Sequence, residues 1–127
     1  MKVINLNEKF GKFTDHFSPK IIAELNGQQV KLGKFIGDFV WHKHDNEDEM
    51  FLVIKGEFFM DIRTKEGNEV LEITLELKEG EMIVIPRGVE HRPHSNEEVQ
   101  VMLFEPAGTL NTGDVNNELT KDNPEWI

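Results

Sequence analysis

Short apolar or alternating runs, separated by glycine, proline and asparagine turn signals, recur along most of this chain and restrict its fold class. Each run is four to seven residues long, and no long helical period occurs before the tail. The expected strands are Ile21–Leu25, Gln29–Phe35, Asp38–His44, Met50–Ile54, Phe58–Arg63, Leu71–Leu77, Met82–Ile85 and Val99–Phe104. Many short strands with turn signals every eight to twelve residues or so predict an all-β sandwich or barrel.

Several of these runs indicate how the strands face. The Asn26-Gly27 pair suits a type I′ turn, so the first two strands are expected to form a hairpin. Leu71–Leu77 alternates strictly, which predicts its apolar side chains inward and its glutamates outward. Met50–Ile54 and Met82–Ile85 are apolar on both faces and are expected to be buried on both sides. A second subunit is the simplest cover for such an outer face, so a homodimer is predicted.

The strand pattern covers the middle of the chain and leaves an arm at each end. The 127 residues of the chain are expected to form a single domain, 1–127, whose barrel core lies at about residues 20–106. The first 19 residues lack a clear period, and a short helix is expected around Asn7–Phe13. Residues 107–127 are rich in glycine, asparagine, threonine and charge, which predicts an irregular C-terminal arm.

Composition excludes several classes of function. The chain has no cysteine, so disulfide frameworks, thiolate zinc sites and cysteine nucleophiles are ruled out. The formal net charge of -10 disfavours nucleic acid and anionic membranes as partners, because phosphate groups select basic patches. No apolar stretch has the length of a signal peptide or a membrane span. We therefore expect a cytoplasmic protein that binds neither nucleic acid nor membranes.

The first group of residues with a chemical signature is a histidine pair followed by a carboxylate. His42 and His44 are two residues apart on the expected strand Asp38–His44, so they would point the same way, about 7 Å apart. Glu49 follows after the acidic turn formed by residues 45–48. Two imidazoles on one face with a carboxylate nearby are typical of half of a transition-metal site.

The second group follows the expected strand Met82–Ile85. Pro86 and Gly88 make a tight turn, and His91 comes three residues later, at the end of a strand. From there His91 is in a position to face the histidine pair of the earlier strand. Three imidazoles and one carboxylate would leave one or two coordination positions open, as catalytic and ligand-binding metals require.

These two segments resemble the two sequence motifs of the cupins. The first reads His-x-His, four residues, a glutamate, six residues and a glycine; the second reads glycine, five residues, Pro-x-Gly, two residues and a histidine. A segment of 23 residues separates the motifs, and the resemblance extends from Gly37 to about His94. Two positions depart from the family pattern, since Gly37 lies five rather than six residues before the first histidine and Ser95 replaces an asparagine. The tail EPAGTLNTGD resembles that of bacterial and archaeal single-domain cupins of unassigned function.

The resemblance implies both a fold and a ligand set. The fold would be an antiparallel double-stranded β-helix, the jelly-roll barrel of cupins, with irregular N- and C-terminal arms. A divalent metal inside the barrel would be held by His42, His44, Glu49 and His91. Imidazole and carboxylate ligands suit Fe, Mn, Ni, Zn or Cu, and the set does not choose between them.

Three functions are compatible with such a site. The first is a metal-dependent enzyme of the oxygenase, isomerase or lyase kind that acts on a small molecule. The second is a non-catalytic module that binds or senses a small ligand, and the third is a barrel with a purely structural metal. The sequence assigns no role to Arg87, His94 or the C-terminal arm.

Overall fold

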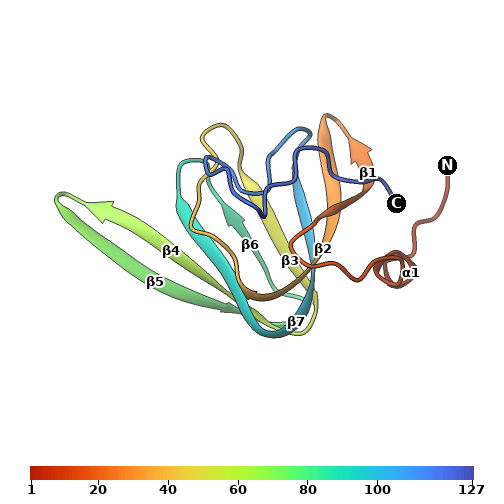
Figure 1. Cartoon of the computed structure of the whole chain (residues 1–127), viewed down its shortest axis with the longest axis horizontal. Helices are drawn as coiled ribbons and strands as arrows, with labels where there is room; N and C mark the ends of the chain where they lie inside the picture. Colours follow the sequence, from red (N-terminus) through yellow and green to blue (C-terminus); the bar gives the residue numbers. More distant parts are fainter.

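An antiparallel sheet that curls over its own inner face dominates the computed structural model, which describes all 127 residues (Figure 1). The elements are α1 (Leu6–Phe10), β1 (Lys20–Leu25), β2 (Gln28–Asp38), β3 (Glu49–Lys55), β4 (Phe58–Glu66), β5 (Glu69–Leu77), β6 (Met82–Ile85) and β7 (Glu90–Pro106). The all-β antiparallel fold predicted from the short runs is confirmed. None of the helical structure has the length and apolarity that crossing a bilayer requires.

The longest strand, β7, joins the parts of the sheet. It pairs with β2 from His94 to Pro106 with one register shift, with β3 through its C-terminal half and with β4 through its N-terminal end. The strand order is β1-β2-β7-β3-β6, and β5 is attached through β4 alone. The sequence predicts only Val99–Phe104 of this strand, whereas β7 begins nine residues earlier, at Glu90.

The inner face of the sheet carries the main core. Phe51 lies opposite Leu103 and Val53 opposite Val101, and all four side chains are buried. Each such side chain contributes about 1.5–3 kcal/mol when it leaves water. The alternating neighbours of these residues point to the outer face, so the two faces of β3 and β7 are both apolar, as expected for Met50–Ile54.

The N-terminal arm covers one end of the outer face. Phe10 of α1 and Phe13 pack with Ile22 and Leu32 in a second, smaller apolar cluster. The Asn5 side chain caps α1 by accepting a hydrogen bond from the Glu8 amide at 2.9 Å. The short helix expected around residues 7–13 is therefore confirmed and begins one residue earlier.

The other end of the outer face has no cover in the single chain. Met82 and Val84 of β6 are 53% and 52% exposed. They lie opposite Leu52 and Met50 of β3, which are half-buried. Burial of Met82–Ile85 on both faces, as the sequence predicts, therefore does not occur within one chain.

The β4–β5 hairpin corrects a prediction about Leu71–Leu77. The alternation is right, but Leu71, Ile73 and Leu75 are 41%, 53% and 38% exposed, and only Leu77 is buried. The reason is that β5 pairs only with β4, and the hairpin extends away from the rest of the sheet (Figure 1). An alternating pattern fixes which face a side chain is on but not whether another layer covers that face.

Asp61 of β4 ties the base of this hairpin to β7. Its carboxylate accepts hydrogen bonds from Thr74 at 2.7 Å and from the Arg92 guanidinium at 2.8 and 3.1 Å, and it contacts the His94 ring at 2.9 Å. Burial opposes ionisation of Asp61, but these partners outweigh it and lower its pKa to about 2. Asp61 is therefore expected to stabilise the fold in its ionised form.

We expect acid to remove the contribution of Asp61. The folded pKa lies below the unfolded one, so the contribution is complete above about pH 4 and is lost as the pH falls toward 2. It amounts to no more than about 2 kcal/mol, because the partly exposed partners are screened by solvent. Urea unfolding of the wild type and Asp61→Asn should differ most near pH 6 and converge near pH 2. A difference that stays constant with pH would contradict this role.

Candidate metal centre

Four side chains from two distant segments converge beside the core. His42, His44, Glu49 and His91 each offer one nitrogen or oxygen atom, and all four atoms lie within 4.8 Å of one another. Each of the four residues is at most 4% exposed. The cluster that the motif spacing predicts is thus present as a geometric group, and it is shielded from solvent.

The backbone that carries His42 and His44 is not a strand. β2 ends at Asp38, after a register shift between Phe35 and Gly37, and the following residues run irregularly to Glu49. The prediction of a strand over Asp38–His44 is wrong, because the pairing with β7 ends at Asp38 and only His42 pairs with β7 again, as an isolated bridge to His91. Both imidazoles nevertheless reach the same site.

Hydrogen bonds from distant parts of the chain fix this irregular segment. His42 exchanges both backbone hydrogen bonds with His91, at 3.0 and 2.8 Å. The His44 carbonyl accepts from the Gly88 amide at 2.7 Å, so the predicted Pro86–Gly88 turn holds the second histidine. His91 itself is the second residue of β7 rather than part of a loop beyond a strand end.

The C-terminal arm supplies a further support. The Asp114 amide donates to the Lys43 carbonyl, and the Asp114 carboxylate accepts from the Lys43 amide, each at 3.0 Å. Gly113 lies so close that an added Cβ would be 2.2 Å from the Lys43 carbonyl oxygen, and its φ is 56°. Only glycine fits there. The arm therefore clamps Lys43, the residue between the two histidines in the sequence, in place.

The tautomers of two imidazoles can be read from their hydrogen bonds. The Nδ1 atoms of His42 and His91 each lie 2.9 Å from a backbone carbonyl, of Val40 and Val89 respectively. A carbonyl only accepts, so each Nδ1 carries the proton and each Nε2 presents a lone pair to the cluster. This is the arrangement by which metal-binding histidines are oriented.

The atoms that face the centre have no partner among themselves. His44 Nε2 and His91 Nε2 lie 3.3 and 3.4 Å from Glu49 Oε1, without hydrogen-bond geometry, and all three atoms are buried and unpaired. Ligands about 2.1 Å from one ion would be separated by roughly 3–4 Å. The unpaired atoms and their spacing therefore fit a transition-metal ion bound between them.

The protonation of the cluster suits the same role. Burial, together with the nearby His91, lowers the pKa of His42 to about 4, so this imidazole is neutral at pH 7. Burial opposes ionisation of Glu49, but contacts with Glu105, His44 and His91 hold its pKa well below the ordinary value. Burial also disfavours the charged form of His44, and Glu49 overcomes this and raises its pKa. The ionised carboxylate of Glu49 and the neutral imidazole of His42 are the forms in which these groups bind a metal.

A buried ion pair that the sequence does not predict lies next to the cluster. Lys31 of β2 donates to Glu105 Oε1 of β7 at 2.8 Å, and both side chains are 2% exposed. Lys31 also makes a long contact of 3.5 Å with the Thr109 carbonyl of the C-terminal arm. Burial and the charge of Glu49 raise the pKa of Glu105 well above its ordinary value, and Lys31 opposes this rise.

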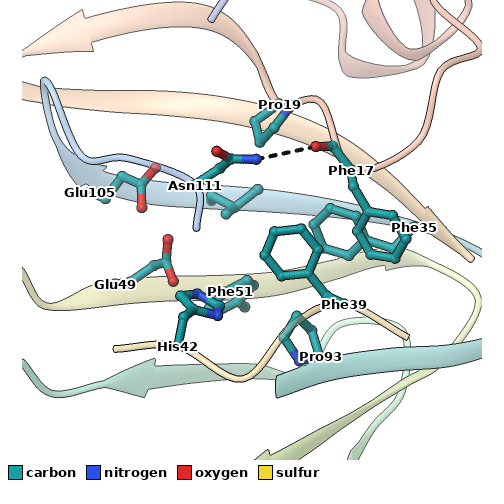
Figure 2. A pocket seen from close by; sticks show the side chains of 11 residues that line it. Phe17, Pro19, Phe35, Phe39, His42, Glu49, Phe51, Pro93, Glu105 and Asn111 are labelled. Atoms are coloured by element: carbon teal, nitrogen blue, oxygen red, sulfur yellow. Dashed lines mark hydrogen bonds between the residues drawn. The ribbon is translucent and has the colours of Figure 1, made fainter. Parts of the chain in front are cut away.

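A cavity adjoins the cluster on its inner side (Figure 2). It is narrow: its enclosed space has room for about one water molecule, and the rest opens to solvent. His42, Glu49 and Glu105 line one side of it, and phenylalanines line the other. At its rim the Asn111 amide of the C-terminal arm donates to the Phe17 carbonyl of the N-terminal arm at 3.4 Å.

The remaining polar residues of the sequence analysis lie outside the cluster. His94 and Arg92 contact Asp61, His16 contacts Glu98, and Arg87 bonds Asp48 on the surface. Arg63 bonds Glu72 and Glu90 and lies over the Trp41 ring at 4.0 Å. Ser95, at the position of the family asparagine, is buried and donates to the Phe35 carbonyl at 3.2 Å. The three arginines are thus all paired with carboxylates.

Comparison with known proteins agrees with the geometry. The family model described as "Cupin domain" (Cupin_2) matches residues 31–105. The chain is 38% identical over 74 residues to the uncharacterised protein YdbB of Bacillus subtilis (strain 168), and 30% identical over 76 residues to an acireductone dioxygenase of Tuber melanosporum (strain Mel28). These matches cover 58% and 59% of this chain but only 59% and 38% of those two relatives.

A solved structure extends the likeness to most of the chain. A cupin-2 domain protein from Shewanella frigidimarina NCIMB 400 superposes with a TM-score of 0.73 at 45% identity, covering 82% of this chain and 94% of that one. The jelly-roll architecture is therefore shared with a relative of almost the same extent.

Proposed function

The chain belongs to the cupin family, and we propose that it binds one divalent transition metal through His42, His44, Glu49 and His91. We further propose that this metal binds or activates a small molecule in the adjoining cavity. The observation that supports this most directly is the set of buried, unpaired ligand atoms that face one another. A bound ion would pair all of them at once. We further infer a reducing compartment, the cytoplasm, because the chain has no cysteine.

The role of the metal follows from what surrounds it. When bound, such an ion can polarise an oxygen atom of a ligand or support redox chemistry. His42 and Glu49 line the cavity as well as the cluster, so a molecule in the cavity would lie beside the metal. A purely structural site has no need of such a space. The likeness to acireductone dioxygenase favours an oxygenase over an isomerase among the enzymatic roles.

The proposal is tested on protein purified without a polyhistidine tag. Elemental mass spectrometry should find close to one equivalent of Fe, Mn, Ni, Zn or Cu per chain after dialysis against a weak chelator. Metal-loaded protein should then consume oxygen with at least one member of a panel of small hydroxylated or carbonyl compounds. Protein that binds none of the five metals would refute the proposal. Metal-loaded protein that binds compounds without turning them over would instead be a binding module.

Gly113 provides a test that leaves every ligand in place. Gly113→Ala should push the segment that carries His42 and His44 away from the arm and weaken metal binding about tenfold or more, since supports of metal ligands have effects of that size. Gly108→Ala is the matched control, because Gly108 also has a positive φ but an added Cβ would meet nothing within 4 Å. Competition with a chromogenic chelator measures both affinities, and equal values for the two variants would contradict the clamp.

We also propose that two copies associate through the uncovered outer face. The face is formed by five neighbouring apolar side chains on β6, β3 and β7: Met50, Leu52, Met82, Val84 and Phe104. The N-terminal arm covers the opposite end of the same sheet face, so this end would otherwise leave a contiguous apolar patch in water. A two-fold axis would place this patch of one chain against the same patch of the second chain, as is common in homodimers.

Light scattering coupled to gel filtration checks the dimer. The wild type should have twice the chain mass at micromolar concentration. Met82→Lys combined with Val84→Lys should give a folded monomer, because charges cannot be buried in an apolar interface without a partner. Leu71→Lys, on the exposed β5 strand, is the control and should leave the dimer intact. A wild-type monomer would contradict the proposal.

A further inference from the structure

A second cavity touches the proposed metal site from the side of the C-terminal arm. It is an open depression between the turn before β3 and this arm, two segments that the backbone hydrogen bond from Asp114 to Lys43 holds together (Figure 1). Its space takes several water molecules, whereas the enclosed part of the inner cavity takes about one. A divalent ion arrives from water with a shell of bound water molecules, and only the depression has the room that such a shell needs.

The wall of the depression is acidic. Asp45, Glu47 and Asp114 line it, and no lysine or arginine does. Glu47 is half-buried and forms neither a hydrogen bond nor an ion pair, while Asp45 lies 3.3 Å from the Lys43 ammonium. Asp114 uses one carboxyl oxygen to accept from the Lys43 amide and has the other free. A cleft lined by charges of one sign focuses its field and accelerates the association of an ion of the opposite sign.

One buried ligand of the proposed metal site also lines this depression. His44 is 4% exposed and is the only member of the cluster in its wall. Hydrogen bonds to backbone carbonyls fix the rings of the other two histidines, but the ring of His44 has no such bond and its Nε2 is unpaired. Burial opposes a charge on His44, whereas Glu49 and then Glu47 and Asp114 raise its pKa, so the acidic wall acts on this ring. His44 therefore connects the depression to the cluster and is the histidine with the greatest freedom to turn.

Resting on the proposed function, we propose that this depression is the entry site for the divalent metal ion. Asp45, Glu47 and Asp114 attract the hydrated ion, and His44 is the first ligand that it meets. Because no backbone carbonyl fixes the ring of His44, the ring can turn outward to bind the ion and then return toward Glu49. The far side of the inner cavity is lined by phenylalanines, which offer no ligand atom to an ion.

The experiment measures how fast metal-free protein takes up cobalt(II), which stands in for zinc and gives a coloured complex. Asp45→Asn combined with Glu47→Gln removes two charges from the depression and leaves Asp114 and all four ligands in place. In stopped-flow absorbance at low ionic strength, this variant should associate with cobalt about tenfold more slowly than the wild type. The difference should shrink in high salt, because salt screens charges at the surface. One equivalent of cobalt should still bind.

The matched control removes the same charge from another part of the surface. Glu79 and Glu97 line a separate acidic depression, which no member of the metal cluster lines. Glu79→Gln combined with Glu97→Gln therefore has the same net charge as the test variant. It should take up cobalt at the wild-type rate at every salt concentration.

Each other outcome overturns the inference. Equal slowing of both variants would make the effect one of net charge alone, and wild-type rates in both would exclude the depression as the route. A test variant that only releases cobalt faster would mean that the carboxylates act on the bound ion rather than on its entry. In these three cases the wild type still binds one equivalent and the proposed function stands. A wild type that binds neither cobalt nor zinc would refute the proposed function together with the inference.

Discussion

His91→Ala is expected to abolish stoichiometric metal binding and to weaken the affinity for zinc at least about 100-fold. Residues that only support a metal ligand have effects of about 10–100-fold, so the loss of a ligand sets that lower bound. His91 is fully buried, its Nε2 is unpaired, and its backbone exchanges two hydrogen bonds with His42. Elemental analysis after dialysis, together with chelator competition, measures the loss.

The melting temperature separates a lost ligand from a damaged fold. Zinc at 1,000 times its dissociation constant should stabilise the wild type by about 4 kcal/mol, and the variant should show no such gain. Comparing the two proteins without metal isolates the cost of the cavity left by the imidazole. His94→Ala is the control, because His94 lies on the same strand but contacts Asp61 rather than the cluster. Stoichiometric zinc in His91→Ala would remove the basis of the proposed function.

The strands that the sequence predicts well are those marked by a short, mostly apolar run of their own. Met50–Ile54 and Phe58–Arg63 are such runs, and they lie within β3 and β4. The N-terminal half of β7 reads EHRPHSNEE and gives no such signal. It is a strand because β2 and β4 pair with it from either side, and those neighbours are distant in the sequence.

The candidate site was likewise only partly predictable. Its four residues could be predicted from the spacing of the two motifs, whereas periodicity alone does not show that they come together. The irregular path of residues 39–48 was not predictable, because bonds to His91, Gly88 and Asp114 determine it. Glu105 did leave a signal: Val99, Val101 and Leu103 alternate inward, and the same alternation places Glu105 on the inner face.

The largest effect on stability is expected where a buried charge loses its partner. Glu105→Leu leaves the Lys31 ammonium, 2% exposed, with only a contact of 3.5 Å to the Thr109 carbonyl. Breaking a buried pair in this way costs about 3–5 kcal/mol. Lys31→Met should cost less, because the carboxyl group that remains can take up a proton in place. Urea unfolding at pH 7 measures both, with the metal removed so that binding does not contribute.

The double variant Lys31→Met/Glu105→Leu tests whether the ion pair itself stabilises the fold. Replacing both partners with apolar side chains of similar volume is often neutral or stabilising, so its free energy of unfolding should return close to that of the wild type. The coupling energy of the cycle would then be large and would show that the two effects are not additive. Additive losses would instead mean that each side chain is stabilised by other neighbours. A nearly neutral double variant would mean that the buried pair beside the metal cluster is not explained by a contribution to stability.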